Sequence, residues 1–451
     1  MAASALVLAL MAAALAPAAA ANDTGKLALQ PVWVCVALAV AVVVTQLVLR
    51  FQSPNLPLLN DKNKHVEPVE SVLQKDEAHE RQAEASQQMY PVSALVSTKA
   101  YGTAKVLAYD AETNVYEVEI GGSEREAVKF VKLGEKEIEV AEVTAFYVYP
   151  IKSCAGIRLD SVDITAKGVL HDRSWMFADE DGKFITQRRY HKMALIVPKL
   201  LPSIENPKFI LLTAPGMDDL AVPILREGAG KETAVRVWSS DMVAIDQGDR
   251  AAKWITAYLA DALGDRQLRF FRVKDSFKRA TDPKYAPDFE TGFADGFPFL
   301  LALDSSLEEL NKSLDHAIPM NRFRPNTSIA NYFYRSGVPT MFVNCSIVLK
   351  GSPPFADERW NCLVIDGVLF RNVKPCSRCN LPCVDQATGV SDPNREPAKT
   401  LTRIRNGQLL GFTGGKKYEN YFGSNLVAER LGKINVGGHV KVLTLKDEIF
   451  A

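Results

Sequence analysis

Three of the seven cysteines lie within eight residues of one another, in the segment KPCSRCNLPCVDQATG at residues 374–389. The sulfur atoms of Cys376, Cys379 and Cys383 could bind a thiophilic metal, since thiolates select zinc, copper and iron–sulfur clusters. A closed zinc site needs four ligands, and the sequence has neither a second CxxC pair nor histidines at a paired spacing. A redox dithiol usually begins a helix in a βαβ unit, which the NLPC segment does not suggest. The pattern therefore leaves three interpretations open: a zinc site, inert buried thiols, or one exposed thiolate that binds an open-coordination metal cofactor.

The composition is that of a globular protein without a bulk charge. The chain has 451 residues, enough for two or three domains, and its hydrophobic and charged fractions of 47% and 24% are ordinary. The formal net charge is zero, so no overall electrostatic field favours nucleic acid. Seven cysteines, scattered outside the one cluster, do not form the framework of a small secreted protein, and they favour a reducing compartment.

The N-terminal part of the chain is apolar. Residues 1–21 carry no charge and end in small residues, as a signal peptide does, but they lack its basic start. The run PVWVCVALAVAVVVTQLVL at residues 31–49 is uncharged and nearly long enough to cross a hydrocarbon core of about 30 Å. Trp33 and Arg50 flank this run as interfacial anchors do, and more basic residues follow it than precede it. We therefore expect a signal-like segment and a membrane anchor in residues 1–50, with the bulk of the chain on the cytosolic side.

Two short regions separate this anchor from the main body. Residues 51–98 are polar, contain proline and have few large apolar side chains, which predicts a linker. In residues 99–140 apolar and polar residues alternate, and AKVLAYDAETNVYEVEI predicts a hairpin that turns at residues 110–114. This second region is either a small β-module that binds a partner or an extension of the next domain.

The sequence from residue 141 onwards predicts an α+β body in which strands dominate. RSWMFADEDGKFITQ has strand-like runs on both sides of an Asp-Gly pair, which is a hairpin signal. An amphipathic helix is predicted with Asp249 as its N-cap and Gly264 as its stop. A second helix is predicted at Ser305, which with Glu308 has the spacing of a capping box. Further strands are predicted at residues 209–213, 234–238, 242–245, 345–349, 362–365 and 436–443.

Six ordered motifs in this body resemble those of a known family. They are YPIKSCAG (149–156), HDRSWMFADEDGKFITQR (171–188), FRPN (323–326), KPCSRC with CVDQATG (374–389), YFGSNL (421–426) and INVGGHVKVL (434–443). Together they resemble the MOSC-domain proteins, and specifically the mitochondrial amidoxime-reducing components, over about two-thirds of the chain. The resemblance implies an N-terminal MOSC β-barrel domain at 141–270 and a MOSC β-barrel domain with packed helices at 271–451.

The resemblance also implies a molybdenum cofactor, whose metal is bound by a pterin dithiolene and one protein thiolate. The family's ligand is the second cysteine of its P-C-x-R-C run, which corresponds to Cys379. Cys376 is then a neighbouring or structural residue, and Cys383 is buried filler. Cys383 is a departure from the family, because many members have threonine there and a thiol is a weaker hydrogen-bond donor than a hydroxyl.

An anionic cofactor requires cations and hydrogen-bond donors around it. The guanidinium fork of arginine suits phosphate and pterin oxygens, and lysine acts as a point charge. Without this context, Lys152 is a turn residue and Arg173 beside Asp172 has the position of a surface ion pair. By resemblance, the residues that contact the pterin, its phosphate or the metal surroundings are Lys152, Ser153, Arg173, Arg324, Asn326 and Arg378.

The function that the resemblance implies is that of a membrane-anchored molybdenum oxidoreductase, which reduces amidoximes and hydroxylamines to amidines and amines. The chain has no GxGxxG after a strand and no CxxCH, so its electrons come from outside, and the family implies cytochrome b5 and an NADH-dependent reductase. The family location is the outer mitochondrial membrane, whereas cleavage of the first 22 residues would favour the endoplasmic reticulum. Two alternatives stay open: a MOSC sulfur carrier with a persulfide on Cys379, and a non-enzymatic membrane adaptor built on residues 101–133.

Overall fold

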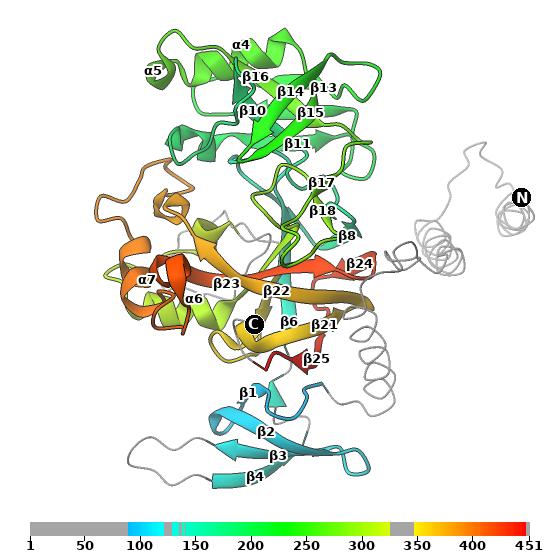
Figure 1. The fold of residues 1–451 in the computed structure, drawn as a ribbon, viewed down its shortest axis with the longest axis vertical. Coiled ribbons are helices and arrows are strands. Elements are labelled where there is room, and N and C mark those ends of the chain that lie inside the picture. Colours follow the sequence, from blue (N-terminus) through cyan, green and yellow to red (C-terminus); the bar gives the residue numbers. More distant parts are fainter. Residues whose placement is uncertain (1–88, 121–128, 135–137, 140, 325–346, 448–451) are drawn as a thin grey trace, which may run out of the picture. The chain divides into compact units, whose positions relative to one another are not determined.

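The computed structural model describes residues 89–120, 129–134, 138–139, 141–324 and 347–447, all of which belong to one compact unit (Figure 1). The predicted membrane anchor at residues 31–49 and the predicted linker up to residue 88 lie outside these residues. Within the described ranges, no helix is both long and apolar enough to cross a membrane. Strands dominate the described chain and helices are few, as predicted.

An antiparallel five-stranded sheet begins the described chain. Its order is β4-β3-β2-β1-β5. Asp110 Oδ1 accepts a hydrogen bond from the N–H of Glu112 at 3.0 Å, so the predicted hairpin turn is confirmed. The first strand lies inside the stretch that was predicted as linker, because LVST is too short to stand out from its polar surroundings. The strands are β1 (Leu95–Thr98), β2 (Gly102–Asp110), β3 (Val115–Ile120), β4 (Lys129–Gly134) and β5 (Ile138–Glu139).

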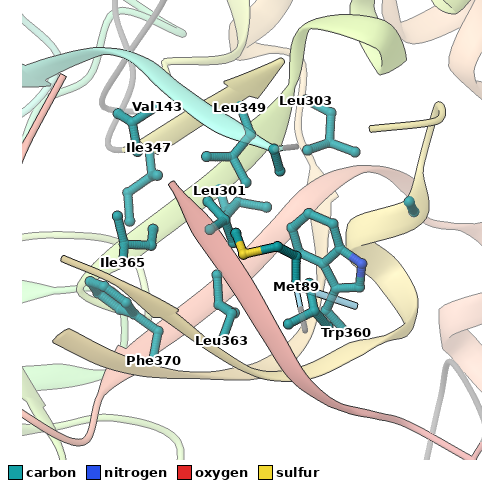
Figure 2. Close-up of a cluster of buried hydrophobic side chains, with 14 of the residues drawn as sticks. Met89, Val143, Leu301, Leu303, Ile347, Leu349, Trp360, Leu363, Ile365 and Phe370 are labelled. Carbon is teal, nitrogen blue, oxygen red and sulfur yellow. The ribbon is translucent and has the colours of Figure 1, made fainter. Parts of the chain in front are cut away.

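The five-stranded sheet shares a hydrophobic core with the larger sheet that follows it. The hydroxyl of Tyr116 accepts a hydrogen bond from the N–H of Met89 at 2.7 Å, and the hydroxyl of Tyr90 accepts one from the N–H of Ala141 at 2.7 Å. Figure 2 shows the side chain of Met89 next to Trp360 of the larger sheet. Of the two interpretations of this region, the shared core supports an extension of the next domain.

The largest sheet joins segments from distant parts of the sequence. Its order is β25-β21-β22-β23-β19-β20-β6-β7. The pair β19–β20 is parallel, and β6 pairs antiparallel with β20, which joins the YPIK segment to the C-terminal strands. The strands are β6 (Glu142–Val148), β7 (Ile157–Leu159), β19 (Phe299–Leu303), β20 (Ile347–Lys350), β21 (Trp360–Ile365), β22 (Val368–Arg378), β23 (Asn420–Ala428) and β25 (Val440–Leu445).

Four smaller sheets form mainly from the middle of the sequence, and one of them also includes a strand near the C-terminus. Their strand orders are β10-β16-β15-β14, β11-β12-β13, β24-β8-β9 and β17-β18. Their strands are β8 (Ser161–Thr165), β9 (Gly168–Val169), β10 (Trp175–Asp179), β11 (Val197–Leu201), β12 (Phe209–Thr213), β13 (Leu220–Pro223), β14 (Glu232–Val237), β15 (Ser240–Asp246), β16 (Leu268–Val273), β17 (Arg279–Ala280), β18 (Glu290–Thr291) and β24 (Gly432–Asn435).

Most of the predicted strands are confirmed, and two differ. The strand at 209–213 has the predicted bounds, and the strands at 242–245 and 362–365 lie within β15 and β21. The Asp-Gly hairpin has only its first strand, β10, because the chain after the turn makes single bridges at Lys183 and Phe184. The strand predicted from residue 436 begins only at Val440.

The first predicted helix forms as two consecutive helices, α4 (Asp249–Tyr258) and α5 (Ala260–Leu263). Gly264 follows with φ of 62°, which confirms it as the stop. The prediction of Asp249 as the N-cap is wrong by one residue, since Gly248 occupies that position with φ of 94° and Asp249 is the first helical residue.

The predicted capping box at Ser305 does not form. Strand β19 leads directly into α6 (Asp304–Asn311), so Leu303 is the N-cap and Ser305 is already helical. The Ser305 Oγ is buried and has no hydrogen-bond partner among the described residues. The other helices are α7 (Ala398–Ile404) and the short 3₁₀ helices η3 (His191–Leu195), η4 (Met320–Phe323), η5 (Ala356–Arg359), η6 (Leu381–Cys383) and η7 (Gly414–Tyr418).

A buried carboxyl in η5 predicts a pH dependence of stability. Ser424 Oγ donates a hydrogen bond to Asp357 Oδ2 at 2.6 Å, and the adjacent Glu358 pairs with Arg405. Burial, and next to it the charge of Glu358, raise the pKa of Asp357 to about 7. The folded state therefore keeps a proton that the unfolded state releases above about pH 4, and stability is lost as the pH rises from about 4 to about 7.

Asp357→Asn should remove this loss, because the amide does not titrate. Between about pH 5 and about pH 8 the free energy of unfolding should fall less in the variant than in the wild type, by roughly 1.4 kcal/mol for each pH unit between 5 and the folded pKa of about 7. Urea unfolding at the two pH values measures the difference. Equal losses in the two proteins would show that Asp357 is ionised in the folded state.

Candidate functional site

A hollow of about 170 Å³, here termed the inner pocket, lies where the loop after β6, the segment 294–300, the end of η4 and the end of β22 meet. The residues that converge on it come from both the YPIK and the PCSRC motifs. Asn326 lies outside the described residues. The predicted site residues that line the inner pocket are Lys152, Ser153, Arg173, Arg324, Arg378 and Cys379.

Three of these residues have a backbone conformation that is rare without glycine. The φ angles are 68° at Ser153, 45° at Arg173 and 44° at Arg324. The Arg173 N–H donates to the Tyr149 carbonyl at 2.6 Å, which holds one of these turns in place. Left-handed residues of this kind cost of order 1–3 kcal/mol and gather at functional sites. Their presence together at one pocket supports a role in binding.

Lys152 is a buried cation fixed by two partners. Its Nζ donates to the carbonyl of Phe293 at 2.8 Å and pairs with Asp295 Oδ1 at 2.5 Å. Burial lowers the pKa of Lys152, and the carboxylate of Asp295 works against this. The side chain of Asp295 is 59% exposed, so this carboxylate also faces solvent. The pair therefore places one positive and one negative charge at the wall of the inner pocket.

Arg173 and Arg324 are held against the same aromatic ring. Each guanidinium carbon lies 4.3 Å from the ring centroid of Tyr149. Arg173 pairs with buried Asp172 at 2.5 Å, whereas Arg324 donates to the carbonyl of Cys154 at 2.6 Å and forms no ion pair within the described residues. Burial lowers the pKa of Arg324 to about 10, so its charge persists at neutral pH. The two guanidinium groups therefore have one carboxylate partner between them among the described residues, so this part of the pocket wall carries a net positive charge.

The three clustered cysteines have different environments. Cys379 follows the last residue of β22, is exposed and lines the inner pocket. Cys376 is partly buried and also lines the pocket. Cys383 is buried in η6, where its Sγ donates to the carbonyl of Arg395 at 3.3 Å and where burial raises the pKa of the thiol. The described residues hold no group of three or more His, Cys, Asp or Glu side chains that could bind a metal ion.

Arg378 contributes an unused hydrogen-bond donor. Its Nη1 donates to Cys376 Sγ at 3.3 Å, and its Nη2 donates to the carbonyl of Phe323. Its Nε is buried and has no hydrogen-bond partner among the described residues. A buried donor without a partner is costly, so this nitrogen favours a polar group in the pocket.

The CVDQATG motif is a loop built around one carboxylate. Asp385 Oδ1 accepts hydrogen bonds from the N–H groups of Ala387 and Thr388, both at 2.9 Å. Its Oδ2 pairs with buried Arg322 at 2.8 Å. These donors lower the pKa of Asp385, although partial burial works in the opposite direction. The motif therefore holds in place the chain that follows Cys379. None of its residues, 383–389, lines the inner pocket.

Sequence reasoning missed three residues at the site. Arg188 lines the inner pocket and is the last residue of the HDRSWMFADEDGKFITQR motif, which could have indicated it. Asp295 also lines the inner pocket, and Trp238 donates a hydrogen bond to its carboxylate at 3.0 Å. Both are isolated in the sequence, and no spacing or motif marks them. The inner pocket therefore carries more charge than was predicted: five cationic side chains and one carboxylate line it.

Comparisons with known proteins agree with the order of these motifs. The models of the MOSC N-terminal beta barrel domain and of the MOSC domain match residues 140–262 and 288–441. "Mitochondrial amidoxime reducing component 2" of Bos taurus is 30% identical over 313 residues, which cover 67% of this chain and 83% of the relative. The chain belongs to the family of amidoxime-reducing components. The component 2 of Homo sapiens is 29% identical and component 1 of Mus musculus 28% identical, each covered to 83% of its length.

The inner pocket suits the molybdenum cofactor that MOSC domains in general bind. Cys379 offers one soft ligand that is open to the pocket. The excess of guanidinium and ammonium groups complements the anionic phosphate of a pterin. The unpartnered Nε of Arg378 adds a donor that such a group can use. The residues present therefore fit the cofactor.

Proposed function

We propose that this protein is a molybdenum-cofactor oxidoreductase that reduces N-hydroxylated compounds, such as amidoximes and hydroxylamines, to amidines and amines. The observation that carries the proposal is the exposed thiol of Cys379 in a pocket with five cationic side chains. The names of the relatives support the reaction class, and the MOSC match supports the cofactor.

In this proposal Cys379 binds the metal, and the bound cofactor supplies two-electron redox chemistry. Arg173 and Arg324 attract its anionic part; because both are largely buried, their charges are weakly screened by salt. Asp295 orients Lys152 through their ion pair, and this keeps the ammonium at the pocket wall. The further contacts are Arg378, Ser153 and Asn326.

The reaction needs electrons and protons from outside the chain. Reduction of an amidoxime breaks the N–O bond, consumes two electrons and two protons and releases water. We propose that cytochrome b5 and an NADH-dependent reductase supply the electrons. A membrane anchor at residues 31–49 would raise the effective concentration of such a donor on the same membrane.

The proposed location is the outer mitochondrial membrane, with the catalytic part in the cytosol. The relatives' names as mitochondrial components support the organelle. The apolar run at residues 31–49 supports attachment to a membrane. Imaging of a C-terminal fluorescent fusion would identify the membrane, and N-terminal sequencing of the mature protein would show whether the first 22 residues are cleaved.

Metal and pterin analysis of the purified full-length protein tests the proposal. We expect roughly one molybdenum atom and one pterin per chain, because a single protein thiolate completes such a site. Protein produced in cells that cannot synthesise the pterin is the control and should contain neither molybdenum nor pterin. Added cytochrome b5, its reductase and NADH should allow only the loaded protein to reduce benzamidoxime.

The same analysis separates the alternatives. Labile sulfane sulfur without molybdenum would identify a sulfur carrier with a persulfide on Cys379. Protein with neither group would favour a membrane adaptor, although the core that the five-stranded sheet shares with the MOSC sheet offers no separate module for that role. Either result would contradict the proposed reductase.

A further inference from the structure

A second hollow, here termed the outer pocket, has a volume of about 420 Å³ and adjoins the inner pocket. Five residues line both pockets, and the proposed metal ligand is one of them: Arg188, Asp295, Ser377, Arg378 and Cys379. The outer pocket differs from the inner one in its walls, which include the aromatic side chains of Trp238 and Tyr418. Its volume falls within the range of small-molecule sites.

Trp238 occupies a strained and exposed position. It lies in the turn between β14 and β15 with φ of 55°, and 46% of it is exposed. A bulky side chain is an outlier in the left-handed region, where a turn normally uses glycine or asparagine. A large apolar residue that is both strained and half-exposed is not explained by the turn or by the core. Its position at the pocket is the remaining explanation.

Three neighbours fix the orientation of the Trp238 indole. Its Nε1 donates to Asp295 Oδ1 at 3.0 Å, and the ring of Phe184 contacts it edge-on at 5.1 Å between centroids. The guanidinium carbon of Arg188 lies 4.6 Å from the indole centroid. The ring is thus held rigidly beside the residues that line the inner pocket.

Tyr418 supplies a second aromatic surface from a separate part of the chain. It is the last residue of η7 and is 75% exposed, with the ammonium of Lys417 at 4.9 Å from its ring. The adjacent Glu419 also lines the outer pocket and accepts a hydrogen bond from the hydroxyl of Tyr421 at 3.1 Å. The outer pocket therefore combines two exposed aromatic rings with the carboxylates of Asp295 and Glu419.

We propose that Trp238 and Tyr418 are specificity-determining residues, which bind the flat conjugated part of an N-hydroxylated substrate while its nitrogen end reaches Cys379. This inference rests on the proposed reductase function and names the substrate class: aromatic amidoximes over small aliphatic ones. Stacking on Trp238, whose ring is already held by its neighbours, adds binding free energy at a low entropic cost for ordering the protein, and Tyr418 adds a second exposed aromatic surface. An aliphatic amidoxime leaves these rings unused.

The test compares benzamidoxime with acetamidoxime in the loaded full-length enzyme. Trp238→Leu and Tyr418→Leu should each raise the KM for benzamidoxime about tenfold, the loss expected for one aromatic contact. In Tyr418→Leu, which leaves the Trp238–Asp295 hydrogen bond in place, the KM for acetamidoxime and both kcat values should change less than about twofold. Tyr101→Leu, which replaces an exposed tyrosine of the five-stranded sheet, is the matched control and should change neither substrate's KM.

Binding without turnover gives an independent measurement. In the absence of a reductant, calorimetry should show the Kd for benzamidoxime rise by the same factor in Trp238→Leu and Tyr418→Leu. If the enzyme is active but the two substitutions change the KM of both substrates equally, or change neither, the inference about the aromatic residues is wrong. The proposed reductase function would still stand. If the wild type reduces neither substrate but the two variants still weaken binding of benzamidoxime, the reductase proposal fails and the aromatic site stands.

Discussion

Replacing Cys379 by serine should abolish the reduction of benzamidoxime and the retention of molybdenum together. A serine hydroxyl is a hard ligand that stays protonated near neutral pH, so it does not replace a thiolate on a thiophilic metal. Loss of a residue that only supports a metal ligand typically costs 10–100-fold, so loss of the ligand itself should exceed about a hundredfold. Activity with benzamidoxime and molybdenum content per chain are the two measurements.

Cys383→Ser is the matched control for Cys379→Ser. Cys383 is buried and its Sγ donates to the carbonyl of Arg395, an interaction that a serine hydroxyl can keep. The variant should therefore retain at least about half of the wild-type activity and molybdenum, since the substitution touches neither pocket. Equal losses from both substitutions would show that several sulfur atoms hold the metal.

The departure of this chain from its family at Cys383 has a structural answer. By resemblance, a thiol where many members have threonine puts identical contacts around the metal in doubt. In the structure Cys383 lies in η6 and is not among the residues that line either pocket. What holds the loop is the network of Asp385 and Arg322, and both residues are present here. The substitution therefore affects the packing of the loop near Arg395.

The local features of the fold could be predicted because they depend on neighbouring residues. A short β-like apolar run predicted the strand at 209–213, and Gly264 ended its helix as predicted. The errors arose where a distant partner decides the local structure. The capping box at Ser305 failed because β19 runs directly into α6. The Asp-Gly turn does bring Phe184 back to Ala178, but its second strand is reduced to single bridges because Lys183 bridges to Arg236.

The candidate site could be predicted only as far as motifs extend. Lys152, Arg173, Arg324 and Cys379 were found because each lies in a run that resembles the family, and the structure places all four at one pocket. Asp295, Trp238 and Tyr418 carry no such signal. They come together through the pairing of non-adjacent strands and through a left-handed turn, which no local pattern in the sequence indicates.

Replacing Arg324 by methionine should weaken retention of the cofactor while the metal ligand stays in place. The guanidinium of Arg324 is buried and has no carboxylate partner among the described residues, so its charge is available to an anion. A charge-assisted hydrogen bond contributes about 1.5–3 kcal/mol, which corresponds to a loss of about 10- to 100-fold in affinity. The ratio of pterin to protein after gel filtration measures retention.

Two further variants separate the charge of Arg324 from its role in packing. Arg324→Lys keeps a cation but loses the planar fork, so pterin retention should lie between that of the wild type and that of Arg324→Met. Arg322→Met removes a neighbouring buried cation that pairs with Asp385, and it should lower the thermal midpoint more than the pterin ratio of the folded fraction. A pterin ratio that falls equally in Arg322→Met and Arg324→Met would attribute the loss to folding.

The pH dependence of pterin retention tests whether the charge of Arg324 holds the cofactor. Burial lowers the pKa of Arg324 to about 10, so the guanidinium keeps its proton up to about pH 9. The attraction to an anionic phosphate should therefore be constant from about pH 7 to about pH 9 and decline only as the pH approaches 10, where the charge is lost. In Arg324→Met, pterin retention should decline less near pH 10, because methionine has no proton to lose. A steep loss of pterin below pH 8 in the wild type would mean that Arg324 is not the cation that holds it.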